Sequence, residues 1–222
     1  MPIRSGALTA LRRPIGCAVP EEIRFHFDPI CPWSYQTSLW VHRLAELGEV
    51  RVEWAVFSLQ LVNAGAESGK GHGRSAQSLR TAIAVRDVHG AGAVGRFYAA
   101  IGRRVHELGE PVDDAETIAG ALTDAGFEPA LFDKAIGDEA TWAAVEAEHR
   151  DAAERLHGFG VPTIVLDGGA GPAIFGPVVS AVPTDADAVE LWRHVAWLTR
   201  YENFSELKRE RTVALDLPAK KH

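Results

Sequence analysis

The reactive chemistry of this sequence centres on the tetrapeptide Cys-Pro-Trp-Ser at residues 31–34. Apolar and polar residues alternate before it over Ile23–Phe27, as in a β-strand, and apolar residues recur after it at helical spacing, up to Leu47. Pro32 suits the first position of a helix because its missing N–H costs nothing there. We therefore expect Cys31 at the start of a helix, where free N–H groups and a partial positive charge lower the pKa of the thiol and favour the nucleophilic thiolate.

Ser34 occupies the position at which a CxxC motif has its second cysteine. Its hydroxyl can point back and donate a hydrogen bond to the sulfur, but a disulfide within the motif is excluded. A reactive Cys31 must then form a mixed disulfide or an adduct with another molecule, which a second thiol releases. Cys17, the other of the two cysteines, is an alternative for that thiol, although nothing in the sequence places it nearby. The competing interpretation of Cys31 is an inert, buried cysteine.

A second candidate sequence is Gly-Val-Pro-Thr at residues 160–163, directly before a strand-like stretch. Pro162 follows a glycine-flanked bend, where an X-Pro bond can be cis. Where this segment faces Cys31, Pro162 offers no N–H, while the backbone of Val161 can pair with an extended thiol substrate. Taken alone, the sequence equally fits the plain start of an edge strand. Together with residues 31–34, it predicts a thiol–disulfide site.

These residues need a scaffold, and local patterns predict one in the order β-α-β, helical block, β-β-α. The strand that ends at Phe27, a helix that Gly48 terminates and a strand over Val50–Phe57 form a βαβ unit. Further strands are predicted at 163–166 and 173–175. A capping box at Thr184 opens the last helix.

The helical block begins with a Gly- and Ser-rich loop at 63–74, of a length that is often functional. Glycine and proline then divide an alanine-rich stretch into four expected helices. These helices are predicted at 75–88, 92–108, 115–125 and 128–156, the last one broken near Gly137.

The predicted fold class is α/β, a thioredoxin fold (β-α-β…β-β-α) with an α-helical insertion domain. We expect a flexible leader at residues 1–20 and a thioredoxin-like domain made of 21–62 and 158–212. Residues 63–157 form the loop and the helical insertion, which acts as a lid over Cys31. The insertion also offers a surface for a homodimer, although no pattern requires one.

Three segments carry a resemblance to a known family: residues 25–35, residues 160–163, and Phe-Gly-Pro at 175–177. From about Glu22 to Arg211 the chain resembles the DsbA-like branch of the thioredoxin superfamily, and most of all the mycothiol-dependent nitroreductase-type proteins. The resemblance implies that Cys31 is the nucleophile, that Pro162 is the cis-proline and that a low-molecular-weight thiol is the reductant.

The sequence departs from that family pattern at Ser34, where many relatives have a second cysteine. This difference favours monothiol chemistry over dithiol protein oxidation. Residues 31–35, Cys-Pro-Trp-Ser-Tyr, are also similar to kappa-class glutathione transferases and the related isomerases. Those enzymes use a serine where this chain has Cys31.

Side chains near the motif are further candidates for binding substrate or thiol, each with a structural alternative. Pro32, Trp33 and Tyr35 lie beside the sulfur; the two aromatic rings suit stacking on an aromatic substrate or packing in the core. His26 could hold a proton near the thiolate or be a core histidine. Three basic residues of the Gly-rich loop could bind the carboxylates of a thiol co-substrate or remain solvated: Lys70, His72 and Arg74.

Composition excludes several other classes of protein. The 222 residues include only two cysteines, too few for a disulfide scaffold. A net charge of -7 disfavours nucleic acid and anionic membranes as partners. No membrane span, metal site or tightly bound cofactor is expected, and the short, proline-interrupted apolar stretch after Arg13 is no signal peptide, so a cytoplasmic location is predicted.

The main functional hypothesis is a thiol-dependent oxidoreductase whose single cysteine, Cys31, forms a mixed disulfide with a disulfide or electrophile substrate. A low-molecular-weight thiol, mycothiol or glutathione, resolves it as co-substrate. One alternative is a kappa-type transferase or isomerase that activates the thiol of the bound co-substrate without covalent participation. The other is a DsbA-like binding or chaperone protein without redox turnover.

Overall fold

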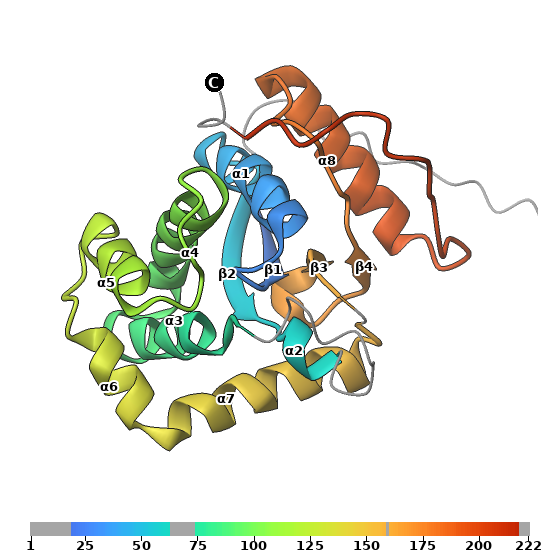
Figure 1. The fold of residues 1–222 in the computed structure, drawn as a ribbon. Coiled ribbons are helices and arrows are strands. Elements are labelled where there is room, and N and C mark those ends of the chain that lie inside the picture. Colours follow the sequence, from blue (N-terminus) through green and yellow to red (C-terminus); the bar gives the residue numbers. More distant parts are fainter. Residues whose placement is uncertain (1–18, 63–73, 159, 218–222) are drawn as a thin grey trace, which may run out of the picture.

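A four-stranded sheet forms the centre of the computed structural model, which describes residues 19–62, 74–158 and 160–217 (Figure 1). Its strand order is β2-β1-β3-β4. β1 pairs parallel with β2 and antiparallel with β3, and β3 pairs antiparallel with β4. The strands are β1 (Glu21–Phe27), β2 (Val50–Val56), β3 (Thr163–Val165) and β4 (Ala173–Phe175). The pairing makes β1 the centre from which the motif at residues 31–34 projects.

Two helices complete this unit, and both begin as the sequence predicts. Helix α1 (Pro32–Glu46) has Cys31 as its N-cap residue and is followed by Gly48 at a φ of 75°, a conformation that favours glycine. Helix α8 (Asp185–Arg200) is capped by the side chain of Thr184. The two helices contact each other through Trp40, whose ring centroid lies 6.3 Å from that of Trp192 and whose Nε1 donates a hydrogen bond to the Ala188 carbonyl, 3.2 Å away.

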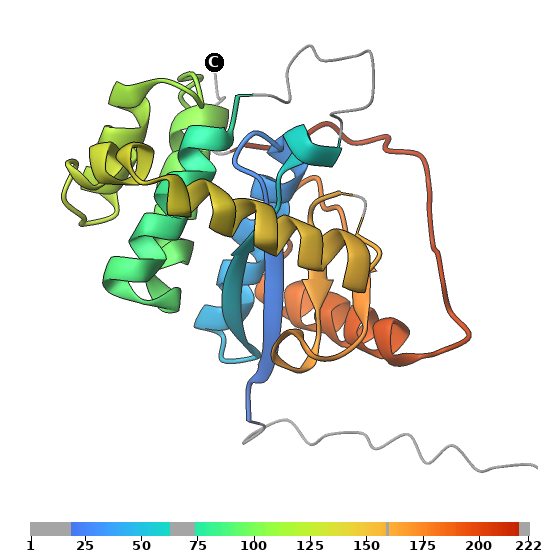
Figure 2. The ribbon, with the colours of Figure 1, turned by 90° about the horizontal axis from the view of Figure 1, so that it is seen from below.

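The segment between β2 and β3 is helical in the part that the structure describes. Its helices are α2 (Leu59–Val62), α3 (Ala76–His89), α4 (Ala91–His106), α5 (Ala115–Asp124), α6 (Leu131–Gly137) and α7 (Glu139–Arg150). Helix α7 lies across the end of the sheet and continues into a π-helical turn at Asp151–Arg155 (Figure 2). Across the described ranges, no helix is long and apolar enough to cross a membrane.

The expected helix at 128–156 is only partly correct. It starts at Leu131 rather than at 128, but the expected break near Gly137 is confirmed: α6 ends at Gly137, and the Asp138 side chain caps α7 by accepting a hydrogen bond from the Ala140 amide at 2.9 Å. The short helix α2 was not predicted. The turn between β3 and β4 contains a short 3₁₀ segment, Asp167–Gly169.

Helix α4 packs directly on α1 and β2, which makes one continuous core. Two of its glycines allow this approach: an added Cβ at Gly102 would lie 2.2 Å from the Tyr35 ring, and one at Gly95 would lie 2.4 Å from Trp54 Nε1. The buried cluster accordingly joins residues of β1 and α1 to residues of α3 to α7. The helical segment is therefore anchored on the same elements that hold Cys31. Its predicted action as a lid stays a prediction.

Candidate active site around Cys31

The Cys31 sulfur lies between the N-terminus of α1 and the segment that leads into β3. Its Sγ accepts a hydrogen bond from the Ser34 amide at 3.4 Å and contacts the Val161 carbonyl oxygen as a donor at 3.8 Å. The next peptide bond, Val161–Pro162, is cis. Two segments that the sequence singled out, far apart along the chain, thus meet at the sulfur.

The side chain of Ser34 has a different partner from the one predicted. Its amide, rather than its hydroxyl, bonds to the Cys31 sulfur. The hydroxyl is buried and accepts a hydrogen bond from the Tyr98 hydroxyl at 3.1 Å. Tyr98 comes from α4, in an alanine-rich stretch without a motif, so no sequence signal pointed to it. The helical segment therefore contributes a side chain that contacts Ser34, three residues after Cys31.

The expectation of a lowered pKa for Cys31 is wrong for the free protein. Burial raises the pKa of this thiol above its ordinary value, and the nearby Asp28 carboxylate raises it further. The amides of Ser34 and Trp33 and the guanidinium of Arg211 act in the opposite direction without offsetting burial. The sequence shows the helix terminus, but the degree of burial depends on the packing around it.

Asp28, the residue after β1, is a further candidate for the site that was not predicted. It is fully buried, and its carboxylate accepts hydrogen bonds from the amides of Leu59 at 2.8 Å and Ile30 at 3.1 Å. These bonds hold the loop before Cys31 against the start of α2. Its position next to the motif was the only available signal.

Apolar side chains form a wall on one side of Cys31. Phe57, Ala152 and Val161 form a small buried cluster, against which Cys31, Leu59 and Leu156 pack. Ala152 belongs to the π-helical turn, so the end of the helical segment reaches the surroundings of Cys31. The wall explains why burial dominates the pKa of the thiol.

Trp33 lies beside Cys31 with a cation over its ring. The guanidinium carbon of Arg211, from the C-terminal segment, is 4.7 Å from the ring centroid. This distance is within the range of a cation–π interaction. Arg211 was not among the predicted site residues, because its position depends on how the C-terminal segment packs against the rest of the chain.

Tyr35 packs inside the protein, as its structural alternative predicted. Only 2% of it is exposed, and its hydroxyl donates a hydrogen bond to Glu107 Oε1 at 2.7 Å. Its ring stacks on His106, whose Nε2 is 2.8 Å from the Pro29 carbonyl oxygen. A direct substrate contact for Tyr35 is therefore not supported. The residue instead connects α1 and the loop before Cys31 to the end of α4.

His26 also fits its structural alternative. It is buried in the sheet, and burial together with Arg24 lowers its pKa from 6.5 to about 4. The ring is therefore neutral at neutral pH. The charged groups that act on it include Asp151 and Arg155 of the π-helical turn. It is unsuited to hold a proton for the thiolate.

The predicted role of the Gly-rich loop concerns residues that mostly lie outside the described ranges. Lys70 and His72 are among them, and Cys17, the candidate for a resolving thiol, also lies outside the described ranges. Arg74 is described and is exposed. Binding of a co-substrate carboxylate by this loop remains a prediction.

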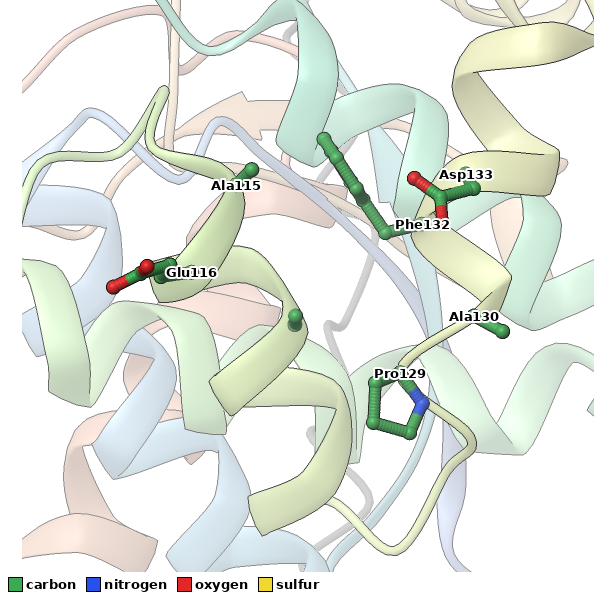
Figure 3. A pocket seen from close by; sticks show the side chains of 7 residues that line it. Ala115, Glu116, Pro129, Ala130, Phe132 and Asp133 are labelled. Carbon is green, nitrogen blue, oxygen red and sulfur yellow. The ribbon is translucent and has the colours of Figure 1, made fainter.

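Two shallow hollows lie elsewhere. One, of about 410 Å³, lies between α5 and α6, where Phe132 and Pro129 supply much of its wall (Figure 3). The other, of about 290 Å³, lies between α2 and the end of α7 and includes His149. Neither contains a residue of the Cys31 motif. In the described part of the chain, no group of three or more His, Cys, Asp or Glu side chains is placed to bind a metal.

Comparison with solved structures confirms the predicted α/β thioredoxin-type fold. The structure is similar to that of a 2-hydroxychromene-2-carboxylate isomerase, with a TM-score of 0.60 and 17% identity over 81% of this chain and 96% of the isomerase. It is also similar to the cytosolic disulfide reductase DsbM from Pseudomonas aeruginosa with GSH, with a TM-score of 0.57 and 16% identity over 79% of this chain and 99% of DsbM. At these identities the likeness concerns the fold alone.

Sequence comparison identifies the family. The chain is 35% identical over 206 residues to Rv2286c, an uncharacterized protein of Mycobacterium tuberculosis, which covers 86% of this chain and 83% of the relative. The family model of the mycothiol-dependent nitroreductase Rv2466c matches residues 30–209, which include the motif of Cys31 and the cis-proline segment. The chain therefore belongs to the Rv2466c-like family of thiol-dependent oxidoreductases.

Proposed function

We propose that the protein reduces a disulfide or electrophile substrate through a single nucleophilic cysteine and a low-molecular-weight thiol. The observation that carries this proposal is the position of the Cys31 sulfur. It lies at the N-cap of α1, 3.4 Å from the Ser34 amide and 3.8 Å from the carbonyl oxygen before Pro162. Ser34 occupies the place of a second cysteine, so the thiol that resolves an intermediate comes from another molecule.

The proposed reaction consists of two thiol–disulfide exchanges. The Cys31 thiolate attacks one sulfur of the substrate disulfide, so the mixed disulfide forms as the substrate bond breaks and one substrate thiolate leaves. A low-molecular-weight thiolate then attacks the substrate sulfur of the mixed disulfide, so Cys31 leaves as a thiolate and the substrate sulfur becomes joined to the co-substrate in a new disulfide. One disulfide bond forms for each one broken, and the co-substrate becomes oxidised.

The raised pKa of Cys31 bears on when the thiol loses its proton. In the free protein the thiol holds its proton more tightly than an ordinary cysteine. The Ser34 and Trp33 amides favour the charged form, and they also stabilise a thiolate that departs from the mixed disulfide. We therefore place deprotonation of Cys31 after substrate binding, when the surroundings of the sulfur change.

Mycothiol is the preferred candidate for the thiol because the matched family model is named for a mycothiol-dependent enzyme. Glutathione is the alternative. We further propose a cytoplasmic location, where low-molecular-weight thiols are kept reduced.

Intact mass spectrometry after incubation with oxidised mycothiol or oxidised glutathione tests the proposal. The Cys17→Ser variant leaves Cys31 as the only cysteine and should gain one thiol adduct, which excess reduced thiol removes. Cys31→Ser is the matched control and should lose the turnover activity. A protein in which Cys17, but not Cys31, gains the adduct would refute the mechanism.

A second candidate is a kappa-type transferase or isomerase, in which the protein activates the thiol of a bound co-substrate. The raised pKa of the half-buried Cys31 thiol favours it, since a neutral side chain there can donate a hydrogen bond to another thiolate. Activity that survives in Cys31→Ser would support this candidate over the oxidoreductase. A protein that binds thiols but turns over none in either form would instead indicate the DsbA-like binding protein.

A further inference from the structure

The C-terminal segment after α8 returns to the helix that carries Cys31. Residues 201–217 contain no helix or strand and run back across the molecule, in dark red, towards α1 (Figures 1 and 2). Ser180 holds the segment at two points: its hydroxyl donates to the Val213 carbonyl at 3.1 Å, and its carbonyl accepts from the Asp216 amide at 2.8 Å. Leu217, the residue after Asp216, is buried. The segment is thus attached close to its end.

The stretch at 177–180, which binds this segment through Ser180, is itself hydrogen-bonded to α1. The buried Thr37 hydroxyl donates to the Pro177 carbonyl at 3.1 Å and accepts from the Val179 amide at 3.5 Å. Two consecutive sets of hydrogen bonds therefore connect α1, the stretch at 177–180 and the C-terminal segment. This connection sets the position of residues near 211 relative to the N-terminal half of α1.

That placement brings the Arg211 side chain over the Trp33 ring. Its guanidinium lies 4.7 Å from the centroid of the Trp33 ring, two positions from Cys31 in the sequence. Among the described side chains that act on the Cys31 thiol, Arg211 is the cation and the buried Asp28 is the anion. The ring orients a guanidinium that is otherwise exposed, because cation and ring attract each other.

We propose that the C-terminal segment completes the Cys31 site and that Arg211 is a positioning residue there. Held on the Trp33 ring, its guanidinium stabilises the Cys31 thiolate and attracts anionic thiol reagents to the sulfur. The inference rests on the proposed function, since it assumes that Cys31 reacts as a thiolate. It adds a residue from outside both motifs and a preference for negative charge in the reacting molecule.

Alkylation kinetics of Cys31 test the inference without any turnover. In a Cys17→Ser background, the rates with neutral iodoacetamide and anionic iodoacetate are measured by intact mass across neutral and alkaline pH. Arg211→Gln should move the pH midpoint of both rates upward and lower the iodoacetate-to-iodoacetamide rate ratio about two- to five-fold, the effect of one exposed charge pair. Arg211→Lys should restore most of the ratio, because it keeps the charge.

Arg209→Gln is the matched control, since Arg209 is an exposed arginine on the same segment and carries the same charge. It should leave the ratio and the midpoint unchanged. An Arg211→Gln protein with an unchanged midpoint and ratio overturns the inference, as does an equal effect in Arg209→Gln. Failure of Cys31 to react with either reagent at any pH in the parent would instead overturn the proposed function.

Discussion

Gly102 is the position at which the packing of the helical segment can be tested most directly. Replacing it with alanine would place a Cβ 2.2 Å from Cδ2 and 2.5 Å from Cε2 of Tyr35. Real Cβ contacts are not this short, so α4 or the ring must move. The ring is not free to do so, because it is buried and its hydroxyl is bonded to Glu107 at 2.7 Å. We expect α4 to shift away from α1.

The expected cost follows from two opposing effects. Alanine in a helix interior is favoured over glycine by about 1 kcal/mol. Overpacking a core typically costs about 1–3 kcal/mol, and this clash is with a fixed ring, so the upper part of that range applies. The net loss in the free energy of unfolding should be about 1–2 kcal/mol. The same shift moves Tyr98 away from Ser34, so the alkylation rate of Cys31 should change as well.

Urea unfolding, followed by tryptophan fluorescence, measures this loss. Gly92→Ala in the same helix is the control, because an added Cβ there has no neighbour within 4 Å. The control should be unchanged or stabilised by up to about 1 kcal/mol. If Gly102→Ala were as stable as Gly92→Ala, α4 would not pack on Tyr35 as described, and the reasoning would fail.

Two further predictions concern buried histidines and the missing cysteine. Burial lowers the pKa of both His26 and His42 from 6.5 to about 4, so below pH 6.5 the unfolded chain binds protons that the folded protein does not. The free energy of unfolding should therefore fall as the pH is lowered from 6.5 to 4, by up to about 3 kcal/mol for each histidine. Urea titrations at both pH values should show a smaller fall for His42→Phe than for the parent protein. Equal falls in the two proteins would contradict this. Ser34→Cys should allow an internal disulfide with Cys31, seen as the loss of two hydrogen atoms in the intact mass on oxidation. It should also lower the amount of mixed disulfide that forms with added thiol. An undiminished amount of that adduct would argue against the proposed role of Ser34.

Much of the fold could be predicted because its strands and helix starts depend on local patterns of residues. Alternation over Ile23–Phe27, the helical spacing after Pro32 and the cap at Thr184 each depend on a few neighbouring residues. The helix expected at 128–156, with its break near Gly137, is found as α6 and α7, although it starts at Leu131 and ends in a π-helical turn. Its break depends on the local cap at Asp138, while its last turn is π-helical where Ala152 packs against Phe57, a contact that periodicity does not report.

The sequence by itself determined the candidate site and its local setting: one cysteine at a helix start, a serine three residues later, and a second segment around Pro162. Residue types and their spacing are sufficient for this, because helix caps and strand starts are local. The tertiary structure alone decided how the sulfur is tuned. Burial against Phe57 and Val161 and the buried Asp28 raise its pKa, and the distant Arg211 opposes them; such effects depend on desolvation and on charges brought together across the whole chain.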